Sequence, residues 1–264
     1  MPVKGDKGKA RVHLVPRASG RFAGQAPMSF ETPPSFMTHW ATAFQSEEED
    51  GGGKLVAYAA GWDGEKLLEA NVDGKLFGAL CDTSPGPDFS RLPIIRLHRL
   101  EVDLREGTAA FSLVPAMART FVDFPKAHPD YEMRRPARYL WCTAANDVGA
   151  STPPQGFVCF DLRTNAADSW SAARGRAAAE QPHVFVSEGV LAARPPRGKE
   201  EDPELAAYLL GMEMDARTGR RSLCVFEAGD LGKGPVCKLH LKHALPWGIH
   251  NEWTPERFWD GAPL

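Results

Sequence analysis

Three strand-like segments of this chain each end in a turn of the same design. The turns begin at Asp103, Asp161 and Asp215, and each reads Asp-x-Arg with a glycine or asparagine four residues after the aspartate. This is hairpin chemistry, because aspartate bonds the turn backbone and Gly or Asn tolerates positive φ. The aspartates lie 58 and then 54 residues apart (103 to 161, 161 to 215). Such an interval is typical of a four-stranded propeller blade lengthened by loops, and coincidence among common hairpin turns is the alternative.

The rest of the chain also favours an all-β fold. Helical periodicity is nearly absent, and 22 prolines and 25 glycines suit many tight connections. We predict a single domain over residues 1–264, with a mobile loop at 46–53 and a second loop at 194–204. At the observed interval the chain supplies about four to five blades, which is part of a seven-bladed β-propeller.

Composition excludes several classes of protein. The net charge of −3 and the lack of a Lys/Arg face argue against nucleic-acid binding. The five cysteines are widely spaced and form no CxxC pair, so neither a disulfide framework nor a structural zinc site is indicated. We expect an intracellular, reducing compartment, either the cytoplasm or a plastid. No apolar run approaches the length of a membrane span, and the basic N-terminus lacks the apolar core of a secretory signal.

Two histidines lie in apolar settings. His39 falls within residues 36–44, whose low polarity predicts a buried strand. His250 follows an alternating strand that Pro246 and Gly248 interrupt, and it is flanked by tryptophan and isoleucine. A histidine delivered from a strand end into an apolar cavity is either a metal ligand or a buried residue hydrogen-bonded to the backbone.

Four stretches, in order along the chain, resemble the motifs of one enzyme family. His39–Gln45 resembles His-x-x-Asn-Ala-Tyr/Phe-Glu, and Leu97–Leu104 resembles Leu-x-Arg followed by Asp-Leu. Asp123–Tyr139 resembles Glu-Phe-Pro followed by Tyr and Arg-Tyr, and Gly234–His250 resembles Gly-Pro-Val followed by Pro-Tyr-Gly-Phe-His. On these motifs the chain, from about residue 11 to 253, resembles the C-terminal half of the carotenoid cleavage oxygenases (carotenoid cleavage dioxygenases).

The resemblance implies an iron site. Members of that family form a seven-bladed propeller with Fe(II) on its axis, held by four histidines whose outer ring nitrogens bond carboxylates. Carried over, His39 and His250 are the third and fourth ligands, and Asp123 stands where the family has a longer glutamate that supports a ligand. A second supporting carboxylate is expected before Val184–Val186, which makes Glu180 the candidate. The first two ligands belong to an N-terminal half that the printed sequence lacks, so we expect a truncated record or a shortened form that is inactive alone.

The implied function is oxidative cleavage of a carbon–carbon double bond of a carotenoid or apocarotenoid, with dioxygen, to two carbonyl products. The partners are an apolar polyene and dioxygen, with peripheral membrane contact through the missing half. A stilbene-cleaving relative is an alternative. Another is a non-catalytic partial-propeller interaction module, which the departures from the family motif at Thr42, Gln45 and Asp123 favour. A third is an unrelated β-sandwich or sugar-binding propeller in which the histidine motifs are accidental, and it predicts that His39 and His250 lie far apart.

Overall fold

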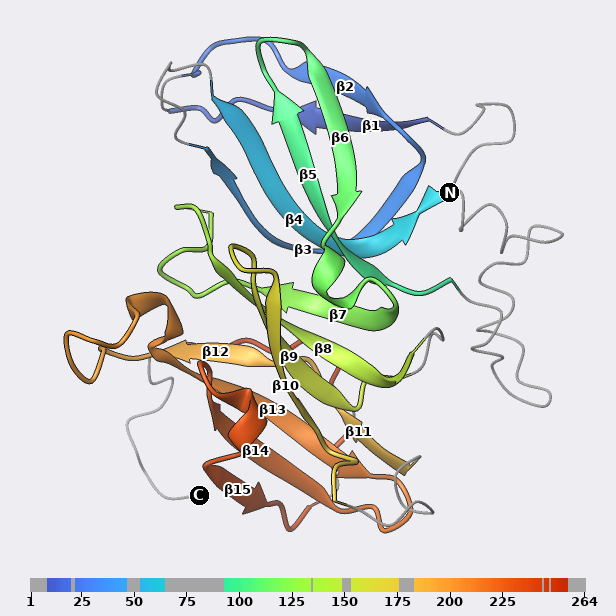
Figure 1. Cartoon of the computed structure of the whole chain (residues 1–264), viewed down its shortest axis with the longest axis vertical. Helices are drawn as coiled ribbons and strands as arrows, with labels where there is room; N and C mark the ends of the chain where they lie inside the picture. The colour runs from blue at the N-terminus through green and yellow to red at the C-terminus, as the bar shows by residue number, and fades with distance from the viewer. Residues whose placement is uncertain are drawn as a thin grey trace, which may run out of the picture.

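The structure, a computed structural model, is built almost entirely of antiparallel β-strands (Figure 1). It describes residues 9–19, 22–46, 53–64, 93–133, 135–148, 153–175, 183–243, 245–246 and 248–255. The short 3-10 helices within these ranges are η3 (Pro115–Met117), η5 (Pro203–Leu205) and η6 (Leu231–Lys233). In this part of the chain no helix is long and apolar enough to cross a membrane. The predicted all-β class is confirmed.

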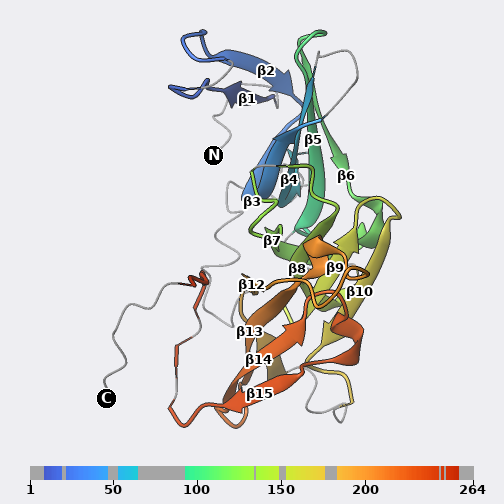
Figure 2. The same ribbon diagram turned by 90° about the vertical axis from the view of Figure 1, so that its left-hand side faces the viewer.

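Three sheets follow one another along the molecule. The first has the order β3 (Ser35–Gln45), β4 (Lys54–Asp63), β5 (Arg96–Asp103) and β6 (Thr108–Leu113). The second has the order β7 (Thr120–Lys126), β8 (Tyr139–Val148), β9 (Gly156–Asp161) and β10 (Ala166–Ser171). In the third, β11 (Val184–Val186) and β12 (Val190–Ala193) both pair with β13 (Ala207–Asp215), which is followed by β14 (Arg221–Glu227) and β15 (Cys237–His240). A smaller sheet pairs β1 (Ala10–Leu14) with β2 (Met28–Thr32) at the end of the molecule opposite β15 (Figures 1 and 2).

The sheets are held together by large apolar side chains between their faces. Trp141, Phe157 and Phe226 lie in one buried cluster between the second and third sheets. The indole of Trp141 also donates a 2.8 Å hydrogen bond to the Ala228 carbonyl across that interface. Leu140 and Phe160, on the opposite face of the second sheet, pack in the cluster shared with the first sheet. Burying both faces explains why β8 and β9 are almost continuously apolar.

The three predicted hairpin turns are present. In each, the aspartate Oδ1 accepts backbone N–H bonds from the residues two and three positions later, at 2.9–3.2 Å. The glycine or asparagine four positions later has a positive φ in every case: Gly107 at 66°, Asn165 at 57° and Gly219 at 68°. These conformations favour glycine and asparagine, which explains the recurring sequence.

The turns do not all occupy the same place in a sheet. Asp103 and Asp161 begin the turns between the third and fourth strands, β5–β6 and β9–β10. Asp215 begins the turn between β13 and β14, which are the second and third strands because β11 and β12 together take the first position. The 58-residue interval is therefore a true sheet-to-sheet repeat, whereas the 54-residue interval is not.

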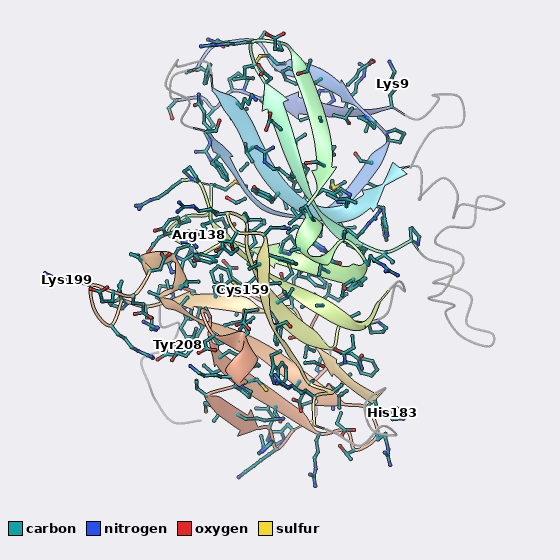
Figure 3. The ribbon with its side chains drawn as sticks, in the orientation of Figure 1. Lys9, Arg138, Cys159, His183, Lys199 and Tyr208 are labelled. Carbon is teal, nitrogen blue, oxygen red and sulfur yellow. The ribbon has the colours of Figure 1, made fainter. Side chains whose placement is uncertain are left out.

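The two predicted loops differ in what the structure describes. Most of 46–53 lies outside the described residues. Residues 194–202 have no regular structure and precede η5. Arg194 anchors the start of this loop with ion pairs to Glu201 at 2.5 Å and Glu227 at 3.0 Å. Lys199, further along the loop, extends away from the sheets (Figure 3).

Candidate metal centre

His39 is placed by an irregular strand at the end of the first sheet. β3 pairs only with β4 among the described strands, and its register shifts between Met37 and His39 and again between Trp40 and Thr42. Each shift leaves an extra residue in β3, as in a β-bulge, and changes the direction in which the neighbouring side chains point. Trp40 is exposed, so the prediction of a fully buried strand is wrong: β3 is an edge strand with one open face. His39 itself is partly buried.

Asp123, from the second sheet, holds the His39 ring. Its Oδ1 atom lies 2.7 Å from the Nδ1 atom of His39. The same oxygen accepts the backbone N–H of Phe124 at 2.8 Å, and the Thr38 hydroxyl lies 3.4 Å from it. Aspartate therefore reaches the histidine without the extra methylene of the family's glutamate.

A bulge in β7 turns its side chains toward His39. Phe124 has φ of 51°, in the left-handed region that non-glycine residues rarely adopt, and the pairing with β8 is irregular between Asp123 and Lys126. In a regular strand Asp123 and Phe124 would face opposite sides of the sheet. Instead both reach the same histidine, since the Phe124 ring centroid lies 4.5 Å from that of His39.

His250 approaches the same point from the far end of the chain. Its ring centroid lies 5.3 Å from that of His39, with the planes at 71°, and 5.8 Å from that of Phe124. The segment around it has no regular structure, and 65% of the His250 side chain is exposed. The interpretation of His250 as a buried residue bonded to backbone is therefore wrong, and so is the alternative fold in which the two histidines lie far apart. Their role as metal ligands stays a prediction.

Glu188 is the carboxylate beside His250. Its Oε2 atom lies 3.4 Å from the Nδ1 atom of His250, and its side chain is only 2% exposed. Glu188 occupies the break between β11 and β12, just after the segment that Glu180 precedes. Glu180 lies outside the described residues, so its predicted role is not tested by the geometry. Glu188 could have been found in the sequence as the one carboxylate within the mostly apolar run 184–193. A carboxylate buried in such a run requires a hydrogen-bonding or charged partner.

The two histidines fit a divalent transition metal as part of a larger donor set. Both Nδ1 atoms face carboxylates, an arrangement that favours the Nδ1–H tautomer and leaves each Nε2 lone pair available for a metal. The described residues contain no group of three or more His, Cys, Asp or Glu side chains arranged to hold a metal. The chain thus offers two nitrogen donors and their supporting carboxylates.

Comparison with known proteins agrees with the motifs. The apocarotenoid-15,15'-oxygenase of Synechocystis sp. is 26% identical over 245 residues, covering 93% of this chain and 43% of that protein. The carotenoid 9,10(9',10')-cleavage dioxygenase 1 of Arabidopsis thaliana is 25% identical, covering 94% of this chain and 41% of that protein. The chain therefore spans about two fifths of the length of these relatives.

Solved structures share the fold over nearly the whole chain. Cobalt-substituted Synechocystis apocarotenoid oxygenase (ACO) superposes with a TM-score of 0.70 at 25% identity, covering 94% of this chain and 44% of that one. An ACO/RPE65 chimera also gives 0.70, at 23% identity and with the same coverage. The four-stranded sheets are consistent with blades of a partial propeller, as predicted. The family model for retinal pigment epithelial membrane protein (RPE65) matches residues 2–255, so the chain belongs to the family that contains this protein and the carotenoid oxygenases.

Proposed function

We propose that this chain is the His39- and His250-bearing part of a non-haem Fe(II) oxygenase that cleaves a carbon–carbon double bond of a carotenoid or apocarotenoid. The observation that carries the proposal is the pair of adjacent imidazoles, each with its Nδ1 atom facing a carboxylate. The names of the relatives support the reaction class, because they are a carotenoid and an apocarotenoid cleaving enzyme.

The reaction inserts one oxygen atom of dioxygen at each carbon of the broken double bond. Two carbonyl products form, and no other reductant or oxidant is needed for the atoms and electrons to balance. Activation of dioxygen is the chemistry that Fe(II) supplies when it is bound, with imidazole nitrogen as its ligand. His39 and His250 would hold it from this chain, and further ligands would come from the rest of the protein.

The residues of this chain set the orientation of the two imidazoles. Asp123 accepts from the Nδ1–H group of His39, and the Oε2 atom of Glu188 lies 3.4 Å from the Nδ1 atom of His250. Both Nε2 atoms are thus directed away from the carboxylates, whose negative charge would balance the positive charge of a cation. The ring of Phe124 lies beside both imidazoles, with its centroid 4.5 Å from that of His39 and 5.8 Å from that of His250. Phe124 thereby adds an apolar surface next to the two imidazoles, which suits an apolar polyene.

We propose a reducing compartment for this protein. The described cysteines are free, three of them buried and one exposed, which suits a reducing compartment such as the cytoplasm or a plastid. Contact with a membrane, the source of an apolar polyene, would be made through parts of the protein outside this chain.

The test is anomalous scattering at the iron edge, with product analysis on an apocarotenoid, in the native-length protein. We expect iron at the Nε2 atoms of His39 and His250, and loss of iron and of both carbonyl products in His39→Ala and His250→Ala. His240→Ala is the matched control, because His240 is an exposed histidine of β15 that bonds the Ser222 hydroxyl at 2.9 Å. Iron bound elsewhere, or none at all, would overturn the proposal and favour a non-catalytic interaction module.

A further inference from the structure

His250 is not held in place by burial or by strand pairing. It follows β15 in a segment without regular structure, and its neighbours Ile249 and Trp253 are exposed like itself. A side chain in such a segment ordinarily samples many orientations. A fixed position opposite His39 therefore requires specific contacts made by the residues next to it.

Asn251 makes those contacts. Its backbone N–H donates to the Oε2 atom of Glu188 at 2.7 Å. Its side-chain amide donates to the Glu188 carbonyl at 3.1 Å and lies 3.4 Å from the Ser187 hydroxyl. Asn251, the residue after His250, thus makes three hydrogen bonds to Ser187 and Glu188, which lie between β11 and β12.

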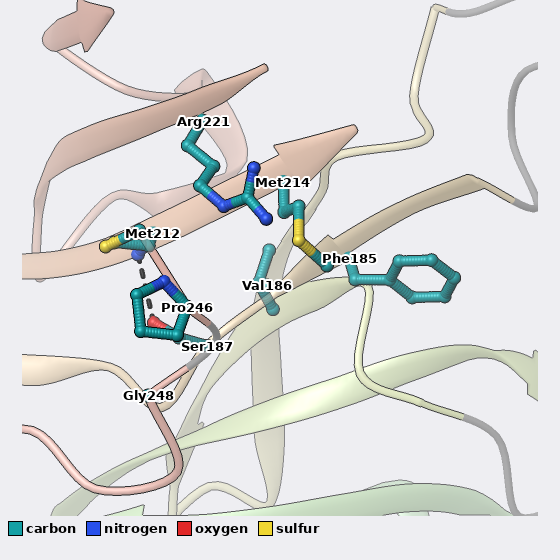
Figure 4. Close-up of a pocket in the computed structure, with 8 residues that line it drawn as sticks. All are labelled: Phe185, Val186, Ser187, Met212, Met214, Arg221, Pro246 and Gly248. Atoms are coloured by element: carbon teal, nitrogen blue, oxygen red, sulfur yellow. Dashed lines mark hydrogen bonds between the residues drawn. The ribbon is translucent and has the colours of Figure 1, made fainter. Parts of the chain in front are cut away.

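The break itself is anchored to the sheet. Ser187 donates its backbone N–H to the Met212 carbonyl at 2.9 Å, and its hydroxyl accepts the Met212 N–H at 3.1 Å. Figure 4 shows this bond, with Pro246 and Gly248 of the His250 segment lining the same small pocket. The segment is tight here, because a Cβ atom on Gly248 would lie 3.2 Å from the Asn251 side-chain oxygen.

Lys126 forms an ion pair with the second oxygen atom of Glu188. Its ammonium lies 2.7 Å from the Oε1 atom, leaving Oε2 for Asn251 and His250. A carboxylate this buried is stable only when it is paired and hydrogen-bonded. The lysine follows the β7 bulge by two residues, so the strand that holds His39 through Asp123 also holds Glu188.

We infer that Asn251 and Lys126 are positioning residues for His250: together they fix the buried Glu188 carboxylate and the backbone beside the imidazole, so that His250 faces His39 with its Nε2 atom free. The geometry of the imidazole stands independently of any metal. Only the effect on metal affinity rests on the proposed function.

The chemistry of the two contacts selects the test variants. Asn251→Asp is isosteric but cannot donate to the Glu188 carbonyl, and it sets a second carboxylate beside Glu188. Lys126→Met keeps the aliphatic stem and removes the cation. Lys126→Arg retains the charge. Lys238→Met is the matched control, since Lys238 pairs with the buried Glu213 at the same 2.7 Å between β15 and β13.

The experiment uses the whole 264-residue chain and two readouts. Nitrogen-15 NMR of the imidazoles gives the tautomer of His250, and titration with Co(II) alone gives a dissociation constant. We expect Asn251→Asp and Lys126→Met to shift His250 from the Nδ1–H toward the Nε2–H tautomer, because the Glu188 oxygen that lies 3.4 Å from Nδ1 is then no longer held in that place. We expect Co(II) affinity to fall about 10- to 100-fold in both, the usual scale for losing a group that supports a ligand. Lys126→Arg and Lys238→Met should resemble the unaltered chain.

The outcomes separate this inference from the proposed function. If the unaltered chain binds Co(II) no better than His39→Ala but Asn251→Asp still shifts the His250 tautomer, the metal site fails and the positioning stands. An unchanged tautomer in both Asn251→Asp and Lys126→Met overturns the positioning, whatever the Co(II) affinity. An equal shift in Lys238→Met also overturns it, because general destabilisation would then be the cause.

Discussion

A single oxygen atom of Asp123 serves both the local turn and the histidine. It accepts from His39 and from the backbone of Phe124, the residue whose positive φ creates the bulge. Contact with the histidine ring and capping of the turn therefore coexist at one oxygen atom. A substitution that preserves hydrogen bonding isolates the contribution of the charge.

Asp123→Asn should separate the effect of the negative charge from the effect of the hydrogen bonds. The asparagine oxygen still accepts from both donors, so the fold is expected to be retained, but the negative charge next to His39 is lost. We expect metal affinity to fall about 10- to 100-fold. Co(II) titration measures it, with Asp168→Asn as control, because Asp168 accepts only a backbone N–H, that of Gly232, among the hydrogen bonds seen. An unchanged Co(II) affinity would show that the charge of Asp123 does not contribute to metal binding and that the residue serves the turn alone.

Glu204 is a buried carboxylate with a different task. Its Oε1 atom accepts the backbone N–H groups of Arg138 and Tyr139, both at 2.8 Å. Burial raises the pKa of Glu204 to about 6 from an ordinary 4.5, and the two backbone hydrogen bonds oppose the shift only in part. The folded chain therefore binds this proton more tightly than the unfolded chain does.

The raised pKa of Glu204 makes the stability of the folded chain depend on pH. The protonated Glu204 contributes stability that is complete below pH 4.5 and is lost as the pH rises through about 6. The free energy involved is about 2 kcal/mol at most. Relative to the unaltered chain, Glu204→Gln should thus gain unfolding free energy between pH 4.5 and 7, measured by urea denaturation. A difference that is flat over this range would show that Glu204 titrates normally.

At the scale of elements, the approach of β3 to β4 depends on a glycine. Gly61 pairs with Met37, two residues before His39, and a Cβ atom there would lie 2.4 Å from the Phe36 carbonyl oxygen and 2.7 Å from the Met37 Cα. These are backbone atoms, so the strand itself would have to move. The shifted register that aims His39 thus relies on the absence of a side chain on the neighbouring strand.

Gly61→Ala should therefore separate the end of β3 from β4. We expect a loss of about 1–3 kcal/mol of stability, the range for an overpacked site. The melting temperature should fall by several degrees for a chain of this size. Gly198→Ala is the control, because nothing lies within 4 Å of its Cβ position. Equal melting temperatures for the two variants would contradict the close approach.

At the scale of the whole molecule, exposed apolar side chains are frequent in β15 and in the segments next to it along the chain. The exposed ones there are Val236, Leu239, Leu245, Ile249 and Trp253. Within the described residues β15 pairs with β14 alone, so its other edge is open. Open apolar edges pair with other chains.

We therefore expect the isolated chain to self-associate through β15. Leu239→Lys should weaken association about tenfold or more, because a contact that buries a leucine is lost and a charge is added. Sedimentation velocity over a range of protein concentrations measures the effect. Val15→Lys is the control, because Val15 is also an exposed apolar residue but lies next to β1, at the opposite end of the molecule. If both variants behave alike, the β15 edge is not the contact.

Local features of this protein can be read from short stretches of its sequence. The turns at Asp103, Asp161 and Asp215 depend on contacts within five residues, and their sequence is sufficient to specify them. The motifs around His39 and His250 were likewise readable in order along the chain.

Contacts between residues far apart in the chain depend on how the strands pair and the sheets pack. A shift of one residue in strand pairing reverses every side chain, so the bulge at Phe124 that turns Asp123 toward His39 is not visible in the strand pattern. The same holds for Glu188, whose partners Lys126 and Asn251 come from the second sheet and from the end of the chain. Local chemistry is encoded within a few residues, whereas a site shared by three sheets depends on how their edges pack together.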